Sequence, residues 1–163
     1  MKKIIFIRHG RAEDSAAEIS DFERSLTTKG KIISKQMAKR FREKEDDPGL
    51  FITSPAFRAL ETAYIFALEL EIKPERIMID SNLYYKSTLK SLFDILSVLD
   101  DKINTITLFG HNPAFTEMPD RLSKHGCEFL TKTSIVCISF DTDTWSSIKP
   151  DTGRQQYFLK PEK

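Results

Sequence analysis

The sequence has few of the residues that mark specialised protein classes. Cys127 and Cys137 are its only cysteines, too few for a disulfide scaffold, and their spacing is not that of a metal or redox site. The apolar run at the N-terminus is far too short for a signal peptide or a membrane span, and Arg8 interrupts it. Glycine and proline are scarce, and no internal repeat or low-complexity segment is present. We therefore expect a cytoplasmic protein.

An excess of charge of one sign is also missing. The 163 residues include 25 basic and 24 acidic ones, a net charge of +1, with no basic stripe or acidic tail. This balance argues against nucleic acid and membrane surfaces as partners. With 40% apolar residues, the length suits a single domain over residues 1–163.

What the chain does contain is an alternation of short apolar runs and helical patterns. Buried strands are predicted at 4–7, 50–53 and 105–109, a short edge strand at 76–79, and a closing pair of strands at 134–140 and 153–159. Helices are predicted from about 29 to 44, from Ser54 to about 70, over 89–99, and after Asn112. Ser54 and Asn112 are each followed by proline and are the expected N-caps. The order predicts a three-layer α/β/α fold with a mainly parallel sheet.

Four residues that carry or can carry positive charge follow three of these strands. Arg8 and His9 end the first, Arg58 lies in the first helical turn after the second, and His111 follows the third. Ligands of open α/β sheets bind outside the carboxyl ends of the strands, so these side chains should meet at one edge. Two guanidiniums, two imidazoles and helix N-termini suit a dianion such as phosphate, with each charge-assisted hydrogen bond contributing roughly 1.5–3 kcal/mol.

Taken singly, these residues have simpler explanations. Arg58 by itself would pair with a glutamate of its own helix, and His111 would be a turn residue. Carboxylates from the loops could also neutralise the cations, but the convergence favours an anion site. A metal at His9 and His111 is not expected, because no carboxylate or thiolate accompanies them and the arginines oppose a cation.

The motifs resemble those of the histidine phosphatase superfamily, which has the phosphoglycerate-mutase-like fold. They are Arg8-His9-Gly10 after a buried strand, Ser54-Pro55-x-x-Arg58-Ala59-x-x-Thr62, and His111 after a later strand. Within the superfamily the chain resembles the small SixA-type phosphohistidine phosphatases in its length and in the segments 24–30, 82–84 and 131–140.

The resemblance implies a role for each matching residue. His9 would be the nucleophile and form a transient phosphohistidine, which requires a neutral reacting nitrogen and a hydrogen bond holding the other. Arg8, Arg58 and His111 would hold the phosphoryl oxygens and stabilise the transition state. No metal or cofactor is implied. Further substrate-binding residues are predicted at Gly10, Arg11 and Asn112.

The chain departs from the family pattern at the general acid. Many relatives have a glutamate in the segment that reads Asp80 to Tyr85 here, and this chain has none; the nearest acidic candidates are Asp80, Glu13 and Asp14. An ester needs a proton donor for its leaving group, whereas a phosphoramidate can carry its own proton.

The departure favours a phosphatase acting on a phosphorylated protein, such as a phosphorelay histidine domain. The alternatives are a phosphatase of small phosphorylated metabolites with the same mechanism, and a non-catalytic module that binds phosphate. A mutase is less well supported, because the chain lacks the glutamate motif.

Overall fold

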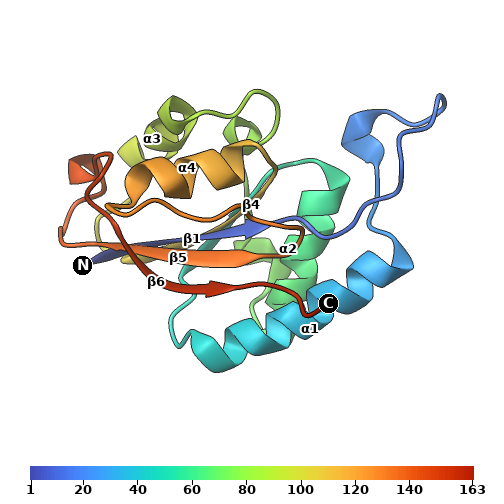
Figure 1. The fold of residues 1–163 in the computed structure, drawn as a ribbon, viewed down its shortest axis with the longest axis horizontal. Helices are drawn as coiled ribbons and strands as arrows, with labels where there is room; N and C mark the ends of the chain where they lie inside the picture. Colours follow the sequence, from blue (N-terminus) through green and yellow to red (C-terminus); the bar gives the residue numbers. More distant parts are fainter.

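The computed structural model describes residues 1–163 and contains one six-stranded sheet with helices on both faces (Figure 1). The strands are β1 (Lys2–Arg8), β2 (Leu50–Thr53), β3 (Met78–Ile79), β4 (Thr105–Gly110), β5 (Ile135–Phe140) and β6 (Arg154–Leu159). The helices are α1 (Thr28–Lys44), α2 (Phe57–Glu69), α3 (Leu89–Ser97) and α4 (Ala114–Leu122), with 3₁₀ turns η1 (Asp21–Glu23), η2 (Pro74–Arg76), η3 (Ser81–Leu83) and η4 (Trp145–Ser147). None of the helices combines the length and apolar character that crossing a membrane requires.

The sheet order is β3-β2-β4-β1-β5-β6. Strands β1 to β4 are parallel to one another, whereas β5 is antiparallel to β1 and β6 is antiparallel to β5. The predicted α/β class with a mainly parallel sheet is therefore confirmed, and the closing pair of strands forms an antiparallel margin.

Strand β1 lies inside the sheet and contributes to the core on both faces. Successive residues of a strand point to opposite faces, so Ile4 and Phe6 join the apolar cluster of α3 and α4. Ile5 and Ile7 join the cluster of α1 and α2 on the other face. All four side chains are fully buried, each contributing roughly 1.5–3 kcal/mol by area. Figure 1 shows this arrangement, with α3 and α4 above the sheet and α1 and α2 below it.

Local signals explain where two of the helices begin. The Thr27 hydroxyl accepts from the Gly30 amide at 2.9 Å, so α1 starts at Thr28, one residue before the predicted start. Helix α3 starts after a capping box formed by Thr88 and Ser91.

The two predicted Ser54 and Asn112 caps are wrong. Helix α2 begins at Phe57 with Ala56 as its N-cap, and α4 begins at Ala114 with Pro113 as its N-cap. The Ser54 hydroxyl contacts the His111 ring at 2.7 Å, and the Asn112 carboxamide nitrogen donates to the Leu130 carbonyl at 2.9 Å. Both polar side chains therefore form tertiary contacts next to the strand ends instead of capping the following helix.

The parallel register brings three strand ends together. Arg8 of β1 is opposite Gly110 of β4, and Thr53 of β2 is opposite Phe109 of β4. The residues that follow these strands therefore leave the sheet at one edge, and the predicted site residues lie there.

Candidate active site

Two histidines lie side by side at this edge of the sheet. The ring centroids of His9 and His111 are 5.0 Å apart with an interplanar angle of 52°. Both side chains are more than nine-tenths buried, and the His9 amide donates to the Gly110 carbonyl at 3.0 Å. The two imidazoles can therefore touch one small ligand.

The tautomer of His9 follows from its hydrogen bond. Its Nδ1 lies 2.6 Å from the Gly10 carbonyl oxygen, which can only accept, so Nδ1 carries the proton and Nε2 has a free lone pair. Burial, followed by the charges of Arg58 and Arg8, lowers the pKa of His9 to about 3 although the Gly10 bond opposes this. The ring is therefore neutral at pH 7.

His111 has one engaged and one unengaged nitrogen. Nε2 lies 2.7 Å from the Ser54 hydroxyl, and Nδ1 is buried without a protein partner. Burial, then the charges of His9 and Arg58, lowers its pKa to about 3. The Ser54 hydroxyl can donate or accept, so the proton of neutral His111 can reside on either nitrogen. Sequence reasoning did not identify Ser54 as a partner of His111, because it expected this serine to cap a helix.

Arg58 is buried at the start of α2 and has a carboxylate partner from a distant loop. Its Nη1 donates to the Asp21 carbonyl at 2.8 Å, and its Nη2 donates to Asp21 Oδ2 at 3.1 Å. The expectation that an anionic ligand, and no loop carboxylate, balances the cations is therefore wrong for Arg58.

Asp21 is a site residue that the sequence reasoning missed. Its Oδ2 also accepts from the Tyr84 hydroxyl at 2.8 Å, and the Tyr84 ring packs against His111 with centroids 5.5 Å apart. Burial alone would raise the pKa of Asp21, but the bonds from Tyr84 and Arg24 and the charge of Arg58 lower it to about 2. Asp21 is therefore ionised at neutral pH and has no proton to donate. No local pattern distinguishes it from the other acidic residues of its loop.

Arg8 has no carboxylate partner. Its Nη1 donates to the Leu130 carbonyl at 3.0 Å, its Nε is buried without a partner, and its guanidinium carbon lies 5.8 Å from the Phe129 ring centroid. Burial lowers its pKa, but a guanidinium stays charged in proteins. Arg8 therefore offers an uncompensated positive charge beside the histidines.

Gly10 and Thr62 hold the end of β1 against α2. The Gly10 amide donates to the Thr62 hydroxyl at 3.0 Å, and that hydroxyl donates to the Arg58 carbonyl at 2.7 Å. A Cβ atom at Gly10 would lie 2.5 Å from the Ser34 hydroxyl oxygen, closer than van der Waals contact permits. The close contact at Gly10 is thus made by α1, and the Gly10 carbonyl holds His9, while contact of Gly10 with substrate stays a prediction.

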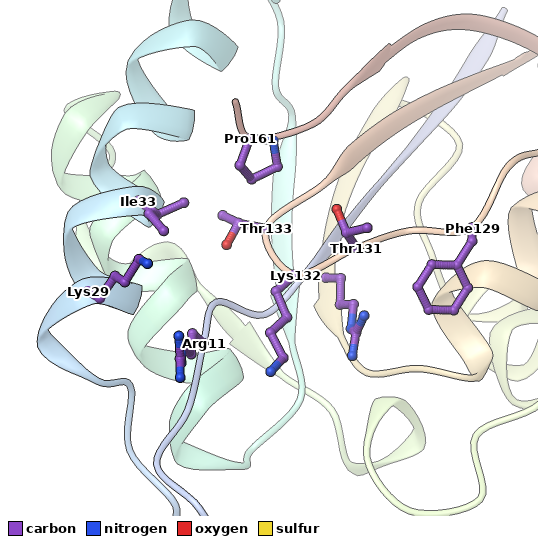
Figure 2. Close-up of a pocket in the computed structure, with 9 residues that line it drawn as sticks. Arg11, Lys29, Ile33, Phe129, Thr131, Lys132, Thr133 and Pro161 are labelled. Atoms are coloured by element: carbon purple, nitrogen blue, oxygen red, sulfur yellow. The ribbon is translucent and has the colours of Figure 1, made fainter. Parts of the chain in front are cut away.

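The two predicted peripheral residues lie in different environments. Arg11 is exposed and lines a groove together with Lys29 and Lys132 (Figure 2). The Asn112 carboxamide donates to the Leu130 carbonyl at 2.9 Å and accepts from Thr116. The side chain of Asn112 is therefore bound to protein groups, and its contact with substrate stays a prediction.

The side chains at this edge of the sheet together form a site suited to bind an oxyanion. Arg8 and Arg58 are guanidiniums beside two neutral imidazoles, one with a free basic nitrogen. No group of three or more His, Cys, Asp or Glu side chains is arranged to hold a metal ion. The donors present are of the kind that bind phosphoryl oxygens.

Comparison with known structures supports the fold. The structure of the protein histidine phosphatase SixA complexed with tungstate superposes with a TM-score of 0.82 at 20% identity, covering 98% of this chain and 97% of that one. A mycobacterial glucosyl-3-phosphoglycerate phosphatase complexed with VO3 matches with a TM-score of 0.71 at 12% identity, over 96% and 98% of the two chains. At these identities the likeness establishes the architecture alone.

Comparison of the sequence with known sequences and family models gives a second line of evidence. An uncharacterized protein of Picosynechococcus sp. is 40% identical over 65 residues, which is 40% of this chain and only 39% of that relative. The model of the histidine phosphatase superfamily (branch 1) matches residues 4–83, a segment that contains Arg8, His9 and Arg58. The match to the histidine phosphatase superfamily thus covers the first half of the fold, residues 4–83, and the architecture of the whole chain agrees with it.

Proposed function

We propose that the protein is a phosphatase that transfers a phosphoryl group to His9 and then to water, and that its substrate is a phosphohistidine of another protein. The observation that carries the proposal is the 2.6 Å hydrogen bond from His9 Nδ1 to the Gly10 carbonyl. This bond leaves Nε2 as an oriented, unprotonated nucleophile beside a second imidazole and two guanidiniums.

In the first step His9 Nε2 attacks phosphorus in line, and the bond from phosphorus to the leaving nitrogen breaks as the new P–N bond forms. The guanidiniums of Arg8 and Arg58 and the His111 ring bind the three phosphoryl oxygens and balance their charge. In the second step water attacks phosphorus, the P–Nε2 bond breaks, and inorganic phosphate leaves. The site thus acts mainly by positioning and by electrostatic stabilisation.

The choice of substrate class rests on the leaving group. The carboxylate at the site, Asp21, has a pKa of about 2 and is engaged with Arg58 and Tyr84, so it has no proton for an alkoxide. A phosphohistidine protonated on its imidazole departs as a neutral ring and needs no acid from the enzyme. General acid catalysis is typically worth about 10²–10⁴-fold, so esters should react slowly here.

The test compares the native protein with His9→Ala on a phosphohistidine-bearing protein such as a phosphorelay histidine domain. The native protein should release phosphate and give an acid-labile phosphoenzyme on rapid quench, and His9→Ala should give neither. The matched control is His125→Ala, which removes an exposed histidine from the loop after α4. Equal rates for the native protein and a folded His9→Ala variant would remove His9 from the mechanism.

The second candidate is a phosphatase of small phosphate esters, which keeps the same nucleophile. It is favoured by the fold likeness to a phosphatase of glucosyl-3-phosphoglycerate. A panel of sugar and nucleotide phosphates separates the two candidates, because turnover of one ester far above that of phosphohistidine would favour the second. A non-catalytic module would instead bind orthovanadate and form no phosphoenzyme.

A further inference from the structure

A groove of about 430 Å³ lies next to the catalytic edge. Its walls come from four segments: the end of β1 and the residues after it with Arg8 and Arg11, the first turns of α1 with Lys29, the loop 129–133 with Phe129 and Lys132, and the chain after β6 with Pro161. Figure 2 shows Lys29 on α1 at one wall, Phe129 at the opposite wall, and Arg11 and Lys132 pointing to the same side between them. The four cations therefore share one groove although they are distant in the sequence.

These cations have no carboxylate partners. Eight ion pairs are present in the molecule, and none includes Arg8, Arg11, Lys29 or Lys132. No acidic residue lines the groove. In a protein whose net charge is only +1, this is a local excess of positive charge that the fold itself does not balance.

The groove adjoins the phosphoryl site at Arg8. Arg8 belongs to both, and the Thr133 amide donates to the carbonyls of Arg8 and His9 at 3.0 and 3.2 Å, which ties the groove loop to the nucleophile. The positive charge of Lys132 also reaches His9, where it contributes to lowering the pKa of that ring. A substrate whose phosphoryl group contacts His9 can therefore extend along this groove.

The shape and lining of the groove indicate the kind of ligand. Its volume is that of a site for several side chains, larger than one anion requires. The Phe129 ring is 61% exposed, so apolar contact is offered beside the cations. Arg11, Lys29 and Lys132 are exposed and come from separate segments, an arrangement that suits several carboxylates along a chain better than one buried dianion.

We propose that this groove binds an acidic segment of the substrate protein, with Asp or Glu side chains adjacent to the phosphohistidine. The proposal rests on the proposed phosphatase activity at His9 and adds that the enzyme prefers substrates with acidic residues flanking the phosphohistidine. The carboxylates pair with Lys29, Lys132 and Arg11, and an apolar side chain of the segment packs on Phe129.

The test uses two phosphohistidine peptides of equal length, one with Asp and Glu beside the phosphohistidine and one with Asn and Gln. The readout is the ratio of kcat/KM for the acidic peptide to that for the neutral one. Each exposed ion pair is worth about 1.4- to 5-fold, so the ratio should fall by about 2- to 30-fold in Lys29→Gln/Lys132→Gln. The matched control is Lys35→Gln/Lys39→Gln, two exposed lysines of α1 outside the groove, in which the ratio should stay as in the native protein.

A second measurement is independent of turnover. Fluorescence polarisation of the labelled, unphosphorylated acidic peptide should show binding to the native protein and to Lys35→Gln/Lys39→Gln. Binding to Lys29→Gln/Lys132→Gln should be weaker, and added salt should weaken the binding to the native protein. Equal ratios for all three proteins, or peptide binding that free glutamate displaces as readily as the peptide itself, would overturn the proposal. Failure of the phosphatase activity would appear differently, as no phosphate release from either peptide while the acidic one still binds.

Discussion

The burial of His9 makes a quantitative prediction about acid stability. Its pKa is about 3 in the folded protein and about 6.5 in an unfolded chain. Below pH 6.5 the unfolded chain therefore binds a proton at His9, whereas the native state binds this proton only near pH 3. The contribution of neutral His9 to the free energy of unfolding is therefore complete above pH 6.5 and is lost as the pH falls towards 3. Between pH 7 and pH 5 this difference costs about 2 kcal/mol for one histidine, a large share of the roughly 5–15 kcal/mol that stabilises a domain.

The assay is urea unfolding at pH 7 and pH 5 of the native protein, His9→Gln and His125→Gln. Glutamine does not titrate, so the stability of His9→Gln relative to the native protein should rise by about 2 kcal/mol on acidification. His125→Gln is the matched control, because it makes the same replacement at an exposed loop histidine outside the site. The reasoning is refuted if the difference between His9→Gln and the native protein is the same at both pH values, since His9 would then titrate alike in both states.

Further predictions follow from the contacts around the nucleophile. Thr62→Val keeps the shape but leaves the Gly10 amide without an acceptor, so unfolding free energy should drop by about 1–3 kcal/mol in urea titrations, with a lower kcat. An unchanged stability would mean that water replaces the hydroxyl. Asp21→Asn removes the charge that competes for Arg58; orthovanadate should then inhibit about 1.4- to 5-fold more tightly, with stability changed by less than about 1 kcal/mol because Asp21 is half exposed. Weaker inhibition would show instead that Asp21 orients Arg58 for its ligand.

Several features of the fold could be predicted because their causes are local. Ile4 to Ile7 form a strand buried on both faces, as a continuous apolar run indicates, and the amphipathic pattern from Leu89 onward forms α3. The parallel register then carries Arg8, His9 and His111 to one edge, as the strand order suggested. The roles of these residues in catalysis stay predictions.

The errors arose where a side chain had both a local and a distant partner available. Ser54 followed by proline has the local pattern of a helix cap, yet its hydroxyl contacts His111, 57 residues away. The Asn112 carboxamide likewise contacts Leu130, 18 residues away, and caps no helix. A propensity describes only the local competition, and the tertiary contact prevailed in both cases.

The strands, the helices and the cationic residues at the strand ends could be read from short stretches of the chain, because apolar periodicity and turn residues act over a few positions. The folded chain was needed to show that Asp21 binds Arg58, 37 residues away, and that Arg11, Lys29 and Lys132 share a groove without acidic partners. These contacts depend on the path of the loops between strands. That path is set by packing over the whole molecule, and no short stretch of residues encodes it.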